Sequence, residues 1–123
     1  MSFLVSFKNF KPIRLNMKRF GQVIKIKPEK LAYYRELHAN PWQSVLDKIH
    51  ECNISNYSIF LLNDELLFAY FEYIGNNFEE DMQKMADDPE TQRWWAETDP
   101  CQQPLELKEG EWWHTMEEIF HTK

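Results

Sequence analysis

The stretch YSIFLLNDELLFAYFEY, residues 57–73, decides the fold because it holds two extended segments and the turn between them. Residues 57–62 and 66–73 consist mainly of aromatic and aliphatic side chains, a composition typical of β-strands. The polar residues 63–65 predict a turn, so the two strands should pair as an antiparallel hairpin. Apolar side chains occupy both faces of the first strand, which indicates that both faces of the sheet are covered, one of them by a second copy of the protein.

Further strands and helices are predicted on both sides of this hairpin. In chain order they are a strand at 19–27, a helix at 28–51 with a break close to residue 40, a helix at 78–86, a helical segment at 89–98 and a strand at 112–121. The first strand follows from period-two alternation, and the helices follow from apolar residues spaced three and four apart. This order predicts an α+β protein with the ferredoxin-like βαββαβ fold, a four-stranded antiparallel sheet with helices on one face.

Proline and asparagine residues set the helix boundaries. Pro28 ends the first strand and suits the first position of a helix. Pro41 lacks a backbone donor and disfavours helical geometry at Asn40, so the helix should break there and resume at Trp42. Asn77 can cap the helix that follows the hairpin.

Length and composition limit the class of protein. A chain of 123 residues is long enough for one domain with a real core and too short for two. Its 43% hydrophobic and 28% charged residues are typical of a soluble globular protein. No apolar run approaches the ~18 residues that a membrane helix needs. The net charge of -6 argues against a nucleic-acid partner, because phosphate binding depends on a basic surface.

Cys52 and Cys101 lie far apart and have no spacing typical of metal ligands. They are expected to be free thiols in a reducing compartment, as in a cytoplasmic protein, with a disulfide as the alternative. Residues 1–16 are basic and contain no acidic residue, which favours an N-terminal extension with Met17 as an alternative start. A weak organellar targeting segment is the other interpretation of this stretch. The domain itself is predicted to span residues 17–123.

Tyr34 and His38 form the first candidate site. They stand four residues apart, so both lie on one face of the predicted helix together with apolar residues such as Val45. A phenol and an imidazole on a buried face are found more often as packed core residues than as catalysts, and spacing alone favours that interpretation. A metal site is not expected, because His114 and His121 have no ligand-like spacing with a second strong ligand.

Four passages, in the same order along the chain, resemble the L-rhamnose mutarotase family. They are MKRFGQVIKIKPEK at 17–30, YRELHANPW at 34–42, NYSIFLLNDELLFAYFEY at 56–73 and DPETQRWWAETDPCQQPL at 88–105. Members of that family are small dimeric enzymes of ferredoxin-like fold that interconvert the α and β anomers of a six-deoxy sugar. One departure concerns the first helix, where members usually carry a proline just after the Trp. Here Pro41 comes just before Trp42.

The resemblance implies roles for individual residues. His38 corresponds to the proposed proton donor, Tyr34 and Tyr57 to phenols that contact the sugar, and Trp94 with Trp95 to the aromatic pair of the binding site. Adjacent helical residues point about 100° apart, so the two Trp side chains cannot both face the same core, and one can pack at a dimer interface. The resemblance also implies a cofactor-free homodimer whose substrate is L-rhamnose or the related deoxy sugar L-fucose.

Exchange of anomers requires opening of the pyranose ring, with a proton delivered to the ring oxygen while another leaves the anomeric hydroxyl. A histidine, with an ordinary pKa of about 6.5, suits this step, and no metal, redox group or covalent intermediate is needed. The proton acceptor is not evident, although Asp99 is a candidate. Two alternatives stay open. The first is a non-catalytic sugar-binding or interaction domain, and the second is a cofactor-free monooxygenase or haem-degrading protein like other dimeric ferredoxin-like proteins.

Overall fold

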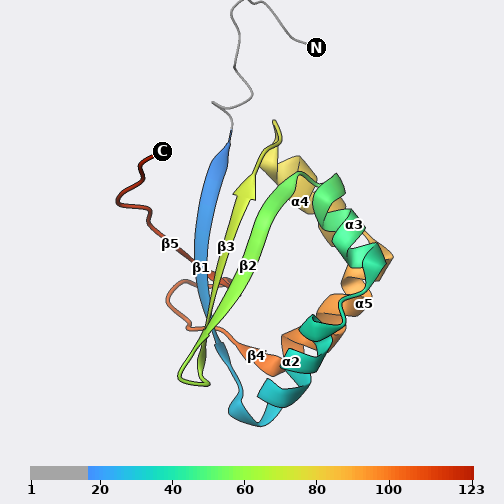
Figure 1. Cartoon of the computed structure of the whole chain (residues 1–123), viewed down its shortest axis with the longest axis vertical. Coiled ribbons are helices and arrows are strands. Elements are labelled where there is room, and N and C mark those ends of the chain that lie inside the picture. The colour runs from blue at the N-terminus through green and yellow to red at the C-terminus, as the bar shows by residue number, and fades with distance from the viewer. Residues whose placement is uncertain (1–16) are drawn as a thin grey trace, which may run out of the picture.

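The structure is a computed structural model, and it describes residues 17–123 (Figure 1). Its elements are, in chain order, β1 (Lys18–Ile26), the 3-10 helix η1 (Pro28–Lys30), α2 (Leu31–Ala39), α3 (Gln43–Glu51), β2 (Ile54–Leu62), β3 (Leu66–Tyr73), α4 (Phe78–Ala86), α5 (Pro89–Thr98), the 3-10 helix η2 (Asp99–Cys101), β4 (Gln102–Gln103) and β5 (His114–Met116). The predicted extension at residues 1–16 lies outside the described residues. Within residues 17–123, no helix is long and apolar enough to cross a membrane.

The strands form one antiparallel sheet in the order β2-β3-β1-β4, and β5 also pairs with β1. β2 and β3 form the predicted hairpin, in which Leu62 lies opposite Leu66 and Ile54 opposite Tyr73. The α-helices of residues 17–123 lie on one side of this sheet, as Figure 1 shows. Strand order and helix position therefore confirm the ferredoxin-like βαββαβ arrangement.

The predicted break in the first helix is confirmed. α2 ends at Ala39, Asn40 has φ -132° and ψ 62°, and α3 begins only after Trp42. Pro41 is the physical cause, because a proline disfavours helical geometry at the residue before it. Asn77 caps α4 as predicted, since its side chain accepts a hydrogen bond from a backbone N–H in the first turn.

The predicted strand at 112–121 is wrong in extent, because only β5 pairs with β1 in that stretch. The place of the fourth strand in the order is taken by β4, which lies outside the strands predicted from the sequence. β4 pairs with residues 25–26 and β5 with residues 21–23, so two short segments share one edge of β1. Pro104 follows β4 and cannot donate to the ladder, so that strand ends after two residues.

β2 contains a β-bulge. Ser55 pairs with Glu72 and Ser58 pairs with Tyr70. β2 therefore advances three residues where β3 advances two, and β2 contains one extra residue. Asn56 in the bulge has φ 52°, in the left-handed region that asparagine tolerates better than most residues. Side chains alternate between the two faces of a strand, and Ile54 faces the helices. The extra residue therefore turns Tyr57 to the helix side as well, where regular alternation would point it away.

Two clusters of buried apolar residues lie at the two ends of the sheet. The first surrounds Ile24 and Leu31 and joins α2 to the sheet, and the second surrounds Tyr73 and holds α4 against the other end. Cys52 and Cys101 are buried and free, as predicted. The space between the two clusters is where the predicted site residues meet.

Candidate active site

Two adjoining cavities, of about 490 and 480 Å³, lie between the sheet and the helices. The residues that line both are Tyr34, His38, Val45, Ile49, Tyr57, Ile59 and Trp94. Because they share these walls, the two cavities adjoin, and we refer to them together as the sheet–helix cavity. Its lining comes from α2, α3, α4 and α5 on one side and mainly from the three long strands on the other.

His38 lies in the last turn of α2 and lines both parts of the sheet–helix cavity. Its Nδ1 atom is 2.8 Å from the backbone carbonyl oxygen of Tyr34. A carbonyl oxygen can only accept, so Nδ1 carries a hydrogen and donates it to that carbonyl. Nε2 has no hydrogen-bond partner among residues 17–123. The nitrogen left for a ligand in the cavity is therefore Nε2.

The surroundings of His38 change how it titrates. The side chain is exposed to the open cavity, while protein atoms on several sides remove part of its hydration. This desolvation lowers the pKa of His38 below its ordinary value of 6.5, and the hydrogen bond to the Tyr34 carbonyl opposes the shift with a smaller effect. The imidazolium form is therefore a stronger acid than a histidine in water.

Tyr34 stands one helical turn before His38, with 4.2 Å between the ring centroids. It is 5% exposed, and its Oη accepts a hydrogen bond of 2.9 Å from Nε2 of Gln102. Burial raises the pKa of Tyr34 well above its ordinary value, and the hydrogen bond from Gln102 lowers it by less. The phenol is consequently a neutral group that still carries its proton.

Tyr57 reaches the sheet–helix cavity from the opposite side, because the bulge of β2 turns it toward the helices. It is 46% exposed, and its ring meets the edge of Phe71 at a centroid distance of 5.8 Å. Desolvation raises the pKa of Tyr57 above its ordinary value, so this phenol is also neutral. Phenols from α2 and from β2 thus line the same hollow.

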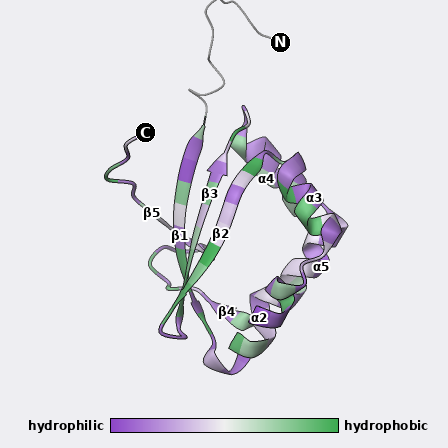
Figure 2. Ribbon diagram, in the orientation of Figure 1, coloured by the Kyte–Doolittle hydropathy of each residue, from purple (hydrophilic) through white to green (hydrophobic). Residues whose placement is uncertain are grey.

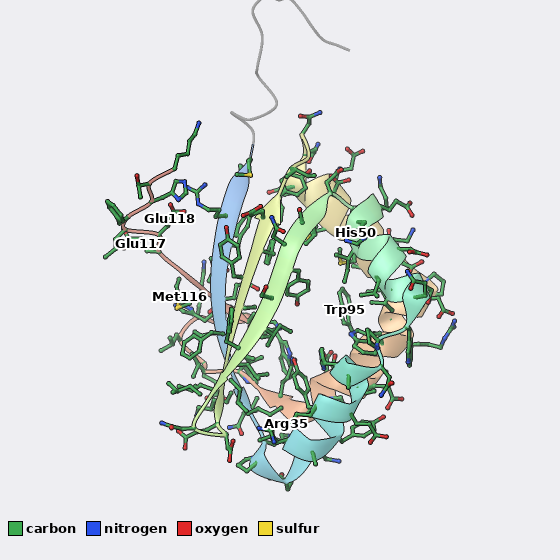
Figure 3. All side chains as sticks on the ribbon, viewed as in Figure 1. Arg35, His50, Trp95, Met116, Glu117 and Glu118 are labelled. Carbon is green, nitrogen blue, oxygen red and sulfur yellow. The ribbon has the colours of Figure 1, made fainter. Side chains whose placement is uncertain are left out.

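Trp94 and Trp95 point in different directions from α5, as helix geometry predicts. Trp94 is 8% exposed and packs edge-on against His38 and Trp42, at centroid distances of 5.3 and 5.1 Å. Trp95 is 37% exposed and lines the cavity, and Figure 3 shows it on the side of α5 that faces the sheet. Trp94 therefore supports the imidazole, whereas Trp95 leaves part of its indole open to a ligand.

All five side chains predicted as site residues thus line the sheet–helix cavity. Sequence reasoning missed Gln22, Gln102 and Trp112, which line it too. Gln102 stands in the quoted passage DPETQRWWAETDPCQQPL, but nothing in its residue type or spacing assigned it a role. Trp112 begins the strand predicted at 112–121, and its position could not be predicted without knowing where the C-terminal segment rejoins β1.

Asp99 lines the same cavity, at the start of η2. Its carboxylate has no hydrogen-bond or ion-pair partner within residues 17–123, and desolvation raises its pKa above the ordinary 3.8. In the described part of the chain, no group of three or more His, Cys, Asp or Glu side chains could hold a metal ion. An imidazole and a carboxylate on one cavity can together deliver one proton and remove another.

Comparisons of the sequence with known proteins all find the same family. A family model described as L-rhamnose mutarotase matches residues 19–122. An L-rhamnose mutarotase from Jannaschia sp. (strain CCS1) is 32% identical over 94 residues, covering 72% of this chain and 88% of the relative. One from Bacillus subtilis (strain 168) is 32% identical over 84 residues, covering 68% of this chain and 79% of the relative.

A solved structure gives the same picture of the fold. The crystal structure of L-rhamnose mutarotase FA22100 from Formosa agariphila superposes with a TM-score of 0.66, covering 86% of this chain and 99% of that one. Sequence identity between the two is 18%, so the likeness concerns the fold.

Proposed function

The chain is an isomerase that belongs to the L-rhamnose mutarotase family, and we propose that it interconverts the α and β anomers of L-rhamnose by acid-base opening of the pyranose ring. The observation that carries this proposal is the free Nε2 of His38 in a cavity that also holds two phenols and an open indole. An imidazole whose pKa is lowered below 6.5 by desolvation can supply the proton transfer that ring opening requires.

His38 is the proton donor in this proposal. Its Nε2–H gives a proton to the ring oxygen while the bond between that oxygen and the anomeric carbon breaks. The anomeric hydroxyl loses its proton to the carboxylate of Asp99, and the anomeric carbon becomes the carbonyl carbon of an open-chain aldose. Rotation about the adjacent carbon–carbon bond presents the other carbonyl face. On closure the attacking hydroxyl returns its proton to His38, and Asp99 gives its proton back to the anomeric oxygen. The lowered pKa of His38 and the raised pKa of Asp99 strengthen the acid and the base respectively.

The rest of the cavity suits a deoxy sugar. Ile49 and Met82 belong to an apolar part of the wall that fits a methyl group. Tyr57 offers a hydroxyl to the sugar oxygens, and the open indole of Trp95 offers a flat apolar surface to the C–H groups of a pyranose. The combination favours a monosaccharide that has both hydroxyls and a methyl, such as L-rhamnose.

Saturation-transfer NMR of anomer exchange tests the proposal. Catalytic amounts of the protein are expected to accelerate exchange of L-rhamnose in proportion to enzyme concentration, with L-fucose and L-mannose as comparison sugars. L-mannose carries a hydroxymethyl group where L-rhamnose carries the methyl, so the apolar wall should make it the poorer substrate. If L-rhamnose raises the melting temperature of the protein without accelerating exchange, the chain is a sugar-binding domain and the proposal fails.

We also propose that a second copy of the chain covers the outer face of the sheet, the face away from the helices. Phe60 and Leu62 of β2 are 63% and 47% exposed there, and Phe60 lies opposite Phe68 of β3. Figure 2 shows that the end of β2 nearest the hairpin turn is hydrophobic. Contiguous exposed apolar side chains on a sheet face are typical of protein interfaces.

Replacing Phe60 with Glu is expected to convert a dimer to a monomer, because the charge would have to be buried at the interface without a partner. Sedimentation velocity measures the change. Leu107→Glu is the matched control, since Leu107 is 65% exposed but lies in the loop after β4. A wild-type protein that sediments as a monomer, or a Phe60→Glu variant that remains a dimer, contradicts this interface.

A further inference from the structure

We propose that Gln102 is a positioning residue that fixes the direction of the hydrogen bonds around Tyr34, so that the phenol O–H donates a hydrogen bond to the bound sugar. This inference rests on the proposed function and adds to it a residue outside the set expected from the sequence. The geometry consists of three side chains in a row, in which Trp112 contacts Gln102 and Gln102 contacts Tyr34.

The direction of this row follows from the chemistry of its first member. Nε1 of Trp112 lies 2.8 Å from one end of the Gln102 amide. An indole N–H can donate but never accept, so the end of the amide that faces it must be the carbonyl oxygen. The amide nitrogen then faces Tyr34, with 2.9 Å between Nε2 of Gln102 and the phenol oxygen. The indole therefore determines which way round the amide sits.

The amide in turn determines where the phenol hydrogen points. Because Gln102 donates to Oη of Tyr34, the phenol oxygen is the acceptor in that contact and its own hydrogen must point elsewhere. No acceptor for this hydrogen is present among the contacts of residues 17–123. Tyr34 lines the sheet–helix cavity beside His38, so the free O–H is available to a sugar oxygen near the imidazole.

The backbone holds Gln102 firmly in this position. Gln102 is 5% exposed and belongs to β4, where it lies opposite Ile26 of β1. The residue before it accepts a backbone hydrogen bond of 2.8 Å from Lys27. A side chain anchored in this way can keep Tyr34 oriented before the sugar arrives, which reduces the ordering required on binding.

Gln102→Glu tests the inference, because the introduced carboxylate has nearly the same shape but can only accept. It would accept from both Trp112 and Tyr34, so the phenol hydrogen would turn away from the sugar. Loss of one hydrogen bond to the substrate is expected to raise KM for L-rhamnose by about 3- to 10-fold with kcat little changed. Gln103→Glu is the matched control, since Gln103 is the exposed neighbour on the same short strand.

Two further variants separate positioning from a merely structural role. In a Tyr34→Phe background, Gln102→Glu should raise KM no further, whereas a general loosening of the fold would add its own effect. Trp112→Phe removes the indole donor and lets the amide turn over, so it should raise KM in the same direction by a smaller factor. It also supplies the test if the buried carboxylate prevents folding, since Trp112 is 41% exposed.

The outcomes distinguish this inference from the proposed function. If the wild-type protein catalyses exchange while Gln102→Glu and Trp112→Phe both keep the wild-type KM, the inference is wrong and the proposed function stands. An additive effect in the Tyr34→Phe background also overturns it. If the wild-type protein neither accelerates exchange nor binds L-rhamnose, the proposed function fails and the inference fails with it.

Discussion

Replacing His38 with Asn is expected to slow catalysed exchange of L-rhamnose anomers by ~10²- to 10⁴-fold, the contribution of a positioned acid-base group. The amide of Asn can still donate to the Tyr34 carbonyl that now accepts from Nδ1, so the helix end keeps its contact. What disappears is Nε2, the nitrogen that faces the cavity and carries the transferable proton. The rate constant for exchange, measured by saturation-transfer NMR at saturating sugar, gives the result directly.

His50→Asn is the matched control, because it makes the same chemical change at an exposed position of α3 that does not line the cavity. Figure 3 labels this residue on the helix. The control should retain wild-type exchange, and both variants should retain the wild-type melting temperature. If His38→Asn exchanges anomers as fast as His50→Asn, His38 takes no part in proton transfer.

The pH dependence of the wild-type rate is a second test of the role of His38. His38 must be in its imidazolium form to give a proton, so the catalysed rate should be high below the pKa of His38 and should fall as pH rises through that pKa. Desolvation lowers that pKa, which centres the fall below 6.5. Asp99 must be ionised to accept, so the rate should rise with pH around a pKa raised above 3.8. The profile is therefore a bell on the acidic side of neutrality, and His38→Asn should lose its alkaline limb.

Replacing Gly75 with Ala is expected to destabilise the fold strongly. A Cβ at this position would lie against Oη of Tyr73 and within 2.7 Å of Nδ2 of Asn53. Oη of Tyr73 and Nδ2 of Asn53 both donate hydrogen bonds to Oδ2 of Asp81, at 2.5 and 2.9 Å, and Tyr73 is 1% exposed. Overpacking costs about 1–3 kcal/mol, and a disrupted buried hydrogen bond costs about 1–3 kcal/mol more. Urea unfolding monitored by tryptophan fluorescence measures the loss.

Gly21 provides the comparison for that variant. The nearest atom to a Cβ added at Gly21 is Cε of Met116, 3.6 Å away, which is an ordinary contact with a flexible side chain. Gly21→Ala should therefore unfold close to the wild-type urea concentration, or slightly above it, because alanine loses less backbone freedom on folding. Equal stability of the two alanine variants would show that the Tyr73 and Asp81 contacts can move at little cost.

Local signals in the sequence were sufficient for most of the fold. α4, α5 and β3 have the predicted boundaries, because capping residues and runs of apolar side chains act within a few positions of each other. Pro41 likewise stopped α2 where a proline must. The grouping of Tyr34 with His38 followed from helical spacing, since residues four apart share a helix face.

The edge of the sheet could not be predicted in the same way. Pairing of β4 and β5 with β1 depends on contacts across more than 70 residues, and no local pattern specifies where such a segment rejoins the sheet. The bulge in β2 was missed for a related reason, because a strand run of Ser and Asn does not show which residue is extra until its partner is known. Gln102 and Trp112 depend on that same edge, so the contact of Trp112 with Gln102 and that of Gln102 with Tyr34 appear only in three dimensions.

The position of some cavity residues outside the two apolar clusters has a consequence for changing the enzyme's selectivity. Gln22, Tyr57 and Trp95 line the sheet–helix cavity but belong to neither cluster. Enzymes commonly lose stability when their selectivity is altered, because the same side chains serve both purposes. At these three positions the two purposes are separated, so libraries that randomise them can search for activity on other monosaccharides in the unmodified parent, without stabilising substitutions being introduced beforehand.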